Sequence, residues 1–417
     1  MARIGIDFGS SFTTMSYVNH EGWATPIKVH GREKIPTILY FPEDGGETLV
    51  GDAAYNKYQD CMDADNPEKM DTILGGIVTG LKHDMSRDGS VATPHGNKSY
   101  VEVISIFLSY LKQYAETYVF NNENITDVCM TYPVSFDWQP EKKDILQESA
   151  LRAGFKNVRL LKEPVAALMG YENRHTIKDE GVLIYDFGGG TFDVAYMMFD
   201  YMGQQQMLPP IGDGECGGQN IDMALYENWD KKVKSAKGRN ISEYENEVFL
   251  PILKANCVKQ KEKMSNGTFG PEFLPLPPAA SVFVKLKALT SQEWNDIVEP
   301  WVDKTIVKTK QMLEAIESHN ASAGNAFRID KVILIGGSSR LPMVYEKLKH
   351  ICPVAPTHVP EVDVAVANGA AIFASKDEIR EERCFCIHCG TQMTNKYRFC
   401  MHCGRNNYRY NHCFDDI

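Results

Sequence analysis

The fold is decided by Val182-Leu183-Ile184-Tyr185-Asp186-Phe187-Gly188-Gly189-Gly190-Thr191-Phe192-Asp193-Val194, in the middle of the chain. An apolar run ends at an aspartate, a turn of small residues follows, and apolar residues then alternate again, which is typical of a β-hairpin. The first residues repeat this pattern as Ile4-Gly5-Ile6-Asp7-Phe8-Gly9-Ser10-Ser11. Two copies so far apart indicate a duplicated half of the molecule rather than a short-period repeat.

Both turns have the composition of a phosphate site. Gly, Ser and Thr allow close approach and let successive backbone N–H groups point at an anion. The aspartate that ends each strand, Asp7 or Asp186, can hold Mg²⁺ through water, because Mg²⁺ dehydrates reluctantly and takes few carboxylates. Two such hairpins facing each other would hold a phosphate tail from both sides. The alternative of two ordinary hairpins is disfavoured, because a third segment, Gly336-Gly337-Ser338, follows the apolar run 332–335.

Other nucleotide motifs are absent or weak. The sequence contains no G-x-x-x-x-G-K-[ST], so it is not a P-loop protein. Gly212-x-Gly214-x-x-Gly217 matches the dinucleotide fingerprint, but no apolar strand leads directly into it, and Asp213 and Glu215 would repel a pyrophosphate.

The remaining patterns indicate a mixed α/β chain. Apolar residues recur at helical spacing between positions 104 and 118, and residues 140–153 begin with a proline and end before Gly154, so both segments predict helices. Residues 267–280 are rich in Pro and Gly and predict a loop.

Composition sets the class of the protein. The 417 residues predict two to four domains, and a net charge of −11 argues against nucleic acid as the main partner. No apolar run approaches the ~20 residues that span a bilayer. The first residues, MARIGIDFGS, lack the basic and apolar regions of a secretory signal. We therefore expect a cytoplasmic protein with no membrane partner.

The cysteines set the end of the chain apart. Six of the eleven fall after residue 383, and four of these form C-x₂-C-x₁₀-C-x₂-C, namely Cys386, Cys389, Cys400 and Cys403. This spacing presents four thiolates to Zn²⁺ as a tetrahedron, and a segment too small to bury a core needs the metal to fold. We predict a zinc ribbon over residues 384–413.

Other interpretations of this tail are weaker. A pair of disulfides is disfavoured in a reducing compartment, and a redox C-x-x-C is disfavoured because the motif is doubled. Cys384 and Cys413 are not needed for four-coordination. Basic residues around the cysteines leave nucleic-acid binding open, but docking of a protein partner is favoured.

Six segments together carry a resemblance to a known family. They are GIDFG (5–9), LKEPVAA (161–167), DFGGGTFD (186–193), GDGECGGQNID (212–222), LIGGSSRLP (334–342) and DVAVANGAA (363–371). The chain is similar to the nucleotide-binding domain of Hsp70 chaperones, within the actin–Hsp70–sugar kinase superfamily.

The resemblance, over residues 3–375, implies an actin-like ATPase fold. Two lobes would surround a deep cleft, each a ribonuclease-H-like α/β core with an inserted subdomain, and the ligands would be ATP or ADP with Mg²⁺. We expect lobe I over residues 1–170 with an insert at about 39–100, and lobe II over 171–378 with an insert at about 219–298.

Roles for individual residues follow from the same resemblance. Asp7 and Asp186 would organise the hydration shell of Mg²⁺. Glu163 would order the attacking water, Asp193 would assist, and Lys82 is the candidate for a lysine from the first insert. Taken alone, these last three could be a helix-start acid, a turn cap and a solvated lysine. The residues expected to bind the nucleotide are Gly9, Ser10, Ser11, Phe12, Gly188, Gly189, Gly190, Thr191, Gly217, Gly218, Lys261, Ser265, Gly336, Gly337, Ser338, Arg340 and Asp363.

The sequence departs from the family in three ways. The first turn has Phe12 in place of Tyr or Asn, which removes a polar contact. The helix expected to contact adenosine keeps Lys261 and Ser265, but it has Val258 for a glutamate and Glu262 for the arginine that stacks on adenine. The residues after 375 do not resemble the hydrophobic linker and peptide-binding domain of the chaperones.

Two functions follow as hypotheses. The first is a slow Mg²⁺-dependent ATPase whose lobe closure regulates an unidentified protein partner. The second is a nucleotide-sensing scaffold with weak turnover, in which the zinc ribbon docks the partner. A sugar or acetate kinase is disfavoured, because DFGGGTFD follows the Hsp70 version of the motif.

Overall fold

The computed structural model describes most of the chain, namely residues 2–62, 67–175, 179–199, 205–238, 240–241, 249–270, 272–275, 283–323, 327–358, 362–376, 383–385 and 392–394. Contacts between residues separate the chain into two units, Met1–Ser375 and Lys376–Ile417. The first unit contains the predicted nucleotide site, and the second contains the cysteine-rich tail.

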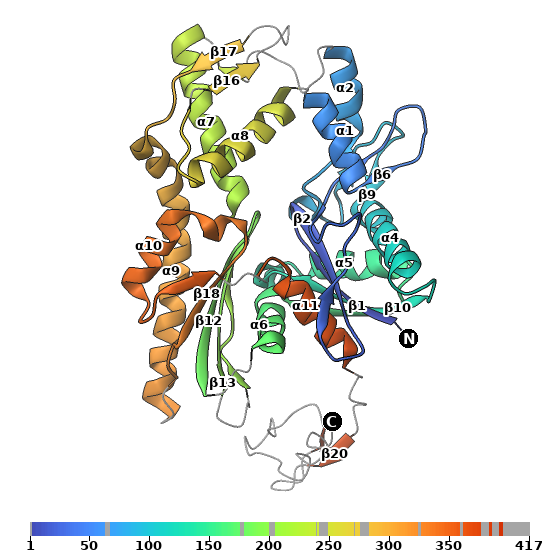
Figure 1. Cartoon of the computed structure of the whole chain (residues 1–417), viewed down its shortest axis with the longest axis vertical. Helices are drawn as coiled ribbons and strands as arrows, with labels where there is room; N and C mark the ends of the chain where they lie inside the picture. The colour runs from blue at the N-terminus through green and yellow to red at the C-terminus, as the bar shows by residue number, and fades with distance from the viewer. Residues whose placement is uncertain are drawn as a thin grey trace. The chain divides into compact units, whose positions relative to one another are not determined.

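Two sheets with the same strand order form the centre of the first unit (Figure 1). They run β11-β10-β1-β2-β3 and β19-β18-β12-β13-β14. In each order the first three strands are parallel to one another. The fourth strand pairs antiparallel with the third, and the fifth pairs antiparallel with the fourth. The strands are β1 (Ala2–Phe8), β2 (Phe12–Val18), β3 (Ala24–Pro26), β10 (Ile125–Tyr132), β11 (Asn157–Lys162), β12 (Glu180–Phe187), β13 (Phe192–Phe199), β14 (Gln205–Met207), β18 (Lys331–Ile335) and β19 (Pro356–His358).

The duplication predicted from the sequence is confirmed at the level of strand order. It extends to an extra strand on each hairpin, since β4 (Ile35–Pro36) pairs with β2 and β15 (Ile211–Asp213) pairs with β13. The limits of the two lobes remain predictions.

Strand β12 shows why the apolar run folds as it does. From Gly181 to Phe187 every residue is buried, as expected of a strand covered on both faces. Leu183 and Tyr185 join one core, while Val182 and Ile184 join another on the opposite face. In the first sheet Ile4, Ile6 and Phe8 join a third core.

Two helices cross between the sheets, α6 (Glu163–Arg174) and α11 (Val362–Ser375) (Figure 1). Glycines make this contact close. A Cβ on Gly369 would lie 1.7 Å from the carbonyl oxygen of Ala166, and one on Gly170 would lie 2.0 Å from that of Ala365. The helices therefore meet backbone to backbone.

Both helices predicted from periodicity are confirmed. They are α4 (Tyr100–Tyr118), which begins with a capping box between Ser99 and Glu102, and α5 (Pro140–Arg152). Gly154 follows α5 with φ +96°, a left-handed conformation that favours glycine.

The predicted loop at 267–280 is wrong in part. Residues Glu272–Pro275 form strand β16, which pairs antiparallel with β17 (Phe283–Leu286). The apolar residues Phe273 and Leu274 favour a strand, and Pro275 is tolerated because β16 is an edge strand in a two-stranded sheet.

Most of the remaining elements fall within the residue ranges given for the two inserts, whose limits stay predictions. The first group comprises β5 (Leu39–Tyr40), β6 (Leu49–Val50), α1 (Asp52–Met62), α2 (Pro67–Gly76), β7 (Ile77–Val78), α3 (Leu81–Asp84), β8 (Ser90–Val91) and β9 (Lys98–Ser99). The second comprises α7 (Gly218–Lys237), α8 (Phe249–Ser265), β16 and β17. Helices α9 (Ser291–Ala323) and α10 (Pro342–Ile351) precede and follow β18.

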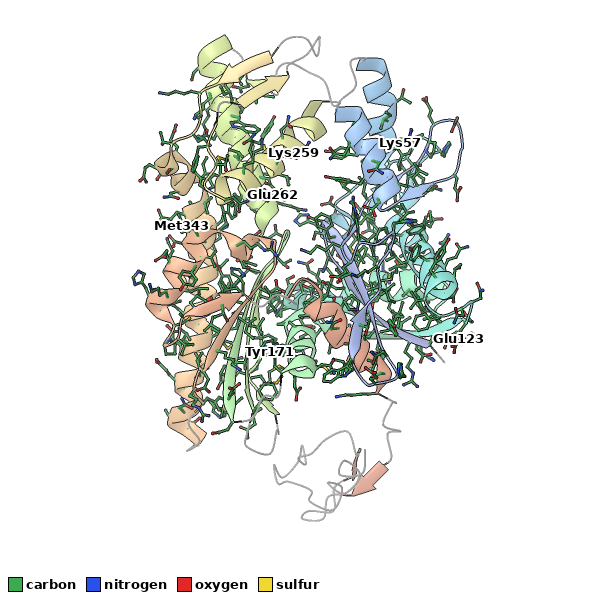
Figure 2. The ribbon with its side chains drawn as sticks, viewed as in Figure 1. Lys57, Glu123, Tyr171, Lys259, Glu262 and Met343 are labelled. Atoms are coloured by element: carbon green, nitrogen blue, oxygen red, sulfur yellow. The ribbon has the colours of Figure 1, made fainter. Side chains whose placement is uncertain are left out.

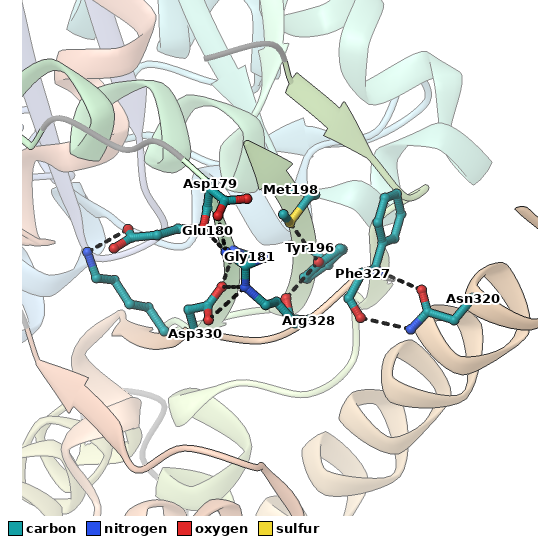
Figure 3. Close-up of polar contacts among 10 residues, drawn as sticks. Asp179, Glu180, Gly181, Tyr196, Met198, Asn320, Phe327, Arg328 and Asp330 are labelled. Carbon is teal, nitrogen blue, oxygen red and sulfur yellow. Dashed lines mark hydrogen bonds and ion pairs between the residues drawn. The ribbon is translucent and has the colours of Figure 1, made fainter. Parts of the chain in front are cut away.

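A polar network holds the start of β12 (Figure 3). Gly181 N donates to Asp330 Oδ2 at 2.8 Å, and Tyr196 Oη donates to the carbonyl of Arg328 at 2.8 Å. The Arg328 guanidinium contacts Asp179 and Asp330. This network fixes the register of β12 and β18 at the end of the sheet away from Asp186.

In the second unit the described residues form one strand pair, β20 (Arg383–Phe385) with β21 (Gln392–Thr394). Across both units, the helices that the structure describes include none long and apolar enough to cross a membrane.

Candidate functional site

A cavity of about 670 Å³ lies in the first unit, and both hairpin turns line it. Most residues predicted to bind a nucleotide or its metal are brought together there: Asp7, Gly9, Ser10, Ser11, Phe12, Lys82, Glu163, Asp186, Gly188, Gly189, Gly190, Thr191, Lys261, Ser265, Gly336, Gly337, Ser338 and Arg340. Segments that are far apart in the sequence therefore form one site.

The two turns approach each other across this cavity. A Cβ on Gly190 would lie 2.9 Å from Ser10 Oγ, and one on Gly189 would lie 3.1 Å from Ser11 Oγ. Small residues on the second turn thus leave room for the serines of the first. Gly217 is the N-cap residue of α7, and a Cβ on it would lie 2.4 Å from the carbonyl carbon of Gly190.

Backbone hydrogen bonds fix the second turn. The N–H of Gly188 donates to the carbonyl of Thr191 at 3.0 Å, and the N–H of Gly218 donates to the carbonyl of Gly188 at 3.0 Å. Ser338 Oγ donates to the same Gly188 carbonyl at 2.8 Å. The turn is thereby tied to both α7 and the segment after β18.

Acidic side chains gather at the ends of the two hairpins. Glu163, Asp186 and Asp193 are buried, with 7%, 9% and 1% of their surface exposed, and Asp7 is half-buried. Burial raises the pKa of all four carboxyl groups. The charge of Glu163 raises the pKa values of Asp186 and Asp193 further, to well above the usual range.

Lys82 faces these carboxylates. It is 5% exposed, and its Nζ donates to Oε1 of Glu163, which begins α6. Burial acts to lower the pKa of Lys82, but the charges of Glu163 and Asp7 outweigh it and raise that pKa. The interpretation of Lys82 as a solvated lysine is therefore wrong.

Asp7 and Asp193 are held by different partners. Thr131 Oγ1, on the neighbouring strand, donates to Asp7 Oδ1 at 3.1 Å. Asp193 Oδ1 accepts the backbone N–H of Val134 at 3.2 Å, and the short helix Val134–Trp138 starts there. Asp193 thus caps a helix and lies beside Asp186 in the antiparallel pair.

The far end of the cavity is formed by α7, α8 and the segment after β18. Lys261 Nζ contacts Asp222 Oδ2 at 2.8 Å and the carbonyl of Gly218 at 3.0 Å. Ser265 Oγ donates to the carbonyl of Lys261 at 2.6 Å. Glu262 also lines the cavity from α8, and it is exposed (Figure 2).

Some predicted residues do not line the cavity. Asp193, Gly217 and Gly218 are not among the lining residues, although the N–H of Gly218 donates to the carbonyl of Gly188, which is one of them. Asp363 belongs to α11, but its side chain is outside the described residues.

Sequence reasoning missed other lining residues, Thr14, Lys34, Gln219, Asp222 and Asn266. Asp222 lies in the segment 212–222 that carries the resemblance, but the resemblance assigns it no role. Thr14 had a signal, because it follows Asp7 at the same spacing at which Asp193 follows Asp186. Nothing in the sequence pointed to Lys34.

Metal ligation by the protein alone is limited in the part of the chain that the structure describes. There, no three His, Cys, Asp or Glu side chains are close enough to hold an ion directly. Cys386, Cys389, Cys400 and Cys403 lie outside the described residues, so their predicted zinc site is not tested.

Comparison with known proteins agrees with this geometry. Residues 3–378 match the family described as Hsp70 protein. The chaperone proteins DnaK of Mesomycoplasma hyopneumoniae strains 232 and 7448 are each 27% identical over 372 residues, which is 88% of this chain and 57% of theirs. The chain thus spans little more than half the length of these relatives. The family match covers both hairpins, the cavity and the two crossing helices, and the chain belongs to the Hsp70 family.

Proposed function

We propose that the cavity binds ATP or ADP with Mg²⁺ and that the protein hydrolyses ATP slowly to ADP and phosphate. The observation that carries this proposal is the meeting of two Gly/Ser turns over buried carboxylates. N–H groups of Gly189, Gly190 and Thr191 would bind phosphate oxygens opposite Ser10 and Ser11. The Gly188 N–H closes its own turn and is left out of this set.

The acidic end of the cavity fits a hydrated divalent cation. Four carboxyl groups with raised pKa values gather near Lys82, so a further positive charge would stabilise their ionised forms. Mg²⁺ usually keeps several waters and takes one or two carboxylates, which suits Asp7 and Asp186 on facing hairpins. When bound, Mg²⁺ would neutralise charge on the phosphates.

Residues of the chain would supply the rest of the chemistry. Glu163 would accept a hydrogen bond from the attacking water and orient it. Lys82 would hold Glu163 in place and add positive charge near the transferred phosphoryl group. Asp193 would assist from the neighbouring strand. Phosphoryl transfer depends mainly on positioning and charge neutralisation, so these roles are sufficient for slow hydrolysis.

Calorimetry tests the binding step. We expect ADP and ATP to bind in MgCl₂ and to bind much more weakly in EDTA. Absence of binding at millimolar nucleotide with MgCl₂ would refute the proposed function. Release of phosphate from ATP measures the hydrolysis step separately.

A nucleotide-sensing scaffold is the second candidate. It is favoured by Val258 and Glu262 at the cavity, where the resemblance leads one to expect a glutamate and an arginine. A wild-type protein that binds Mg²⁺ with ATP but releases no phosphate above background would favour this function over the first.

We also propose that residues 384–413 form a zinc ribbon that docks a protein partner. The first cysteine pair, Cys386 and Cys389, falls in sequence between the paired strands β20 and β21, which supports a hairpin there. Elemental analysis should find one Zn²⁺ per chain. Cys386→Ser should lower this content, whereas Cys413→Ser, the matched control, should leave it unchanged.

The partner would be found by its dependence on nucleotide. We expect a pull-down in ATP to recover a different amount of it than one in ADP. Equal recovery in both would argue against regulation by lobe closure, while loss of recovery with Cys386→Ser would support docking through the ribbon.

A further inference from the structure

The hydroxyl group of Thr14 is buried and has no described hydrogen-bond partner. Thr14 is 4% exposed, its Oγ1 is shielded from solvent, and the residue lines the cavity. A buried hydroxyl without a partner costs about 1–3 kcal/mol, so such groups in native proteins call for an explanation. The cavity that Thr14 lines is the place from which a bound group can supply that partner.

The position of Thr14 repeats that of a residue already assigned to the site. In the first hairpin Asp7 pairs with Thr14, and in the second Asp186 pairs with Asp193. Because the two sheets share strand order, Thr14 is the counterpart of Asp193. The first hairpin therefore presents a neutral hydroxyl where the second presents a carboxylate.

The two threonines beside Asp7 differ in their partners. Thr131, on β10, donates its hydroxyl to Asp7 Oδ1 at 3.1 Å. Thr14, on β2, is on the other side of Asp7 in the same sheet. One neighbour thus orients the carboxylate, and the hydroxyl group of the other has no described hydrogen-bond partner.

We propose that Thr14 is a positioning residue for Mg²⁺, accepting a hydrogen bond from a metal-bound water beside Asp7. This inference rests on the proposed function. Waters on Mg²⁺ are strong donors, and a hydroxyl oxygen accepts from them without adding charge to a site that already holds four carboxyl groups. A carboxylate at this position would add to the repulsion among them.

The test uses Thr14→Val, which keeps the shape of the side chain and removes the hydroxyl. Because the hydroxyl has no partner in the unliganded protein, the melting temperature without ligand should stay unchanged or rise. The dissociation constant for ADP in MgCl₂ should rise about five- to tenfold, which is the worth of one such hydrogen bond. The dissociation constant for ADP in EDTA should not change.

Two further variants separate positioning from packing. Thr14→Ser keeps the hydroxyl and loses the methyl group, so it should hold the dissociation constant in MgCl₂ within about twofold of wild type. Thr13→Val is the matched control on the same strand. Thr13 Oγ1 is 2.9 Å from Thr37 Oγ1, so its loss should lower the melting temperature and leave ADP binding unchanged.

Three outcomes overturn the proposal. They are equal ADP affinity of Thr14→Val and wild type in MgCl₂, an equal loss of affinity in EDTA, and an equal loss in Thr14→Ser. If Thr14→Val fails to fold, Thr14→Ser against Thr14→Ala gives the same contrast. Wild-type protein that binds no ADP refutes the proposed function itself, whereas normal wild-type binding with an unaffected Thr14→Val refutes this inference alone.

Discussion

The two hairpins of the cavity share strand order and register but differ in charge. In the first, Asp7 lies between two threonines, Thr14 and Thr131. In the second, Asp186 lies beside another carboxylate, Asp193. The pKa of Asp7 is raised by burial, whereas those of Asp186 and Asp193 are raised well above the usual range by burial and by the negative charge of Glu163. Duplication thus preserved geometry while the chemistry diverged.

This difference has a consequence for the unliganded protein. The second hairpin carries two carboxyl groups with strongly raised pKa values, whereas in the first the single carboxyl group of Asp7 accepts a hydrogen bond from Thr131. A cation between the hairpins would therefore stabilise the ionised carboxyl groups of the second hairpin more than that of the first. Variants that alter one hairpin at a time, or that alter Glu163, therefore test this difference in charge.

The largest effect is expected at Glu163, which belongs to neither hairpin. Glu163→Gln keeps the shape but removes the charge that would orient water, so ATP turnover should fall about 10²-fold or more. The dissociation constant for ADP in MgCl₂ should change little. Phosphate release and calorimetry measure the two quantities.

The control for this variant is Glu148→Gln, at an ion pair with Arg87 on the surface, which should leave turnover unchanged. Turnover of Glu163→Gln equal to wild type would shift the function from ATPase to nucleotide-sensing scaffold.

The next effect compares the aspartates directly. Asp7→Asn and Asp186→Asn should each weaken the binding of ADP in MgCl₂ by about 10- to 100-fold, as residues around a metal do. Only Asp186→Asn should clearly raise the melting temperature without ligand, because it removes the more strongly disfavoured charge. Equal melting temperatures of the two variants would contradict the charge difference between the hairpins.

A third expectation concerns protons. A carboxyl group whose pKa is raised by folding stabilises the fold below its ordinary value of 3.8, and this contribution is lost as the pH rises through the raised pKa. The unliganded protein should therefore lose stability as the pH rises above about 4. Binding of Mg²⁺ with ADP should release protons, more at pH 6 than at pH 8.

Calorimetry in buffers of different ionisation enthalpy measures this release. Asp186→Asn should reduce it more than Asp7→Asn does. Uptake of protons, or no exchange at either pH, would contradict the sign of the pKa shifts.

The sequence predicted the site better than it predicted the parts around it. Repeats such as DFGGGTFD carry their own strand, turn and ligand pattern, so local residues sufficed to locate both turns. The burial of Lys82 could not be read locally, since it depends on α3 meeting α6 through tertiary packing. Strand β16 was missed because its pairing with β17 outweighs the loop preference of nearby Pro and Gly.

The smallest effect is expected where the two turns differ in one side chain. Phe12 ends the first turn and Thr191 ends the second. Phe12 is 48% exposed, and the backbone around it is fixed by pairing with Pro36 and by the Thr37 N–H, which donates to the Ser11 carbonyl at 2.9 Å. Phe12→Tyr should therefore leave the turn unchanged and add one hydroxyl group in competition with water.

Such an exposed hydrogen bond is worth little, so Phe12→Tyr should tighten ADP binding in MgCl₂ by no more than about threefold. Thr191→Val, which removes the matching hydroxyl group from the second turn, should weaken it by a similar factor. Calorimetry measures the dissociation constant for ADP in MgCl₂ of both variants. Phe120→Tyr, away from the cavity, is the control. A tenfold gain in Phe12→Tyr would mean that the first turn, not the second, limits phosphate binding, and the two hairpins would then differ in affinity as well as in charge.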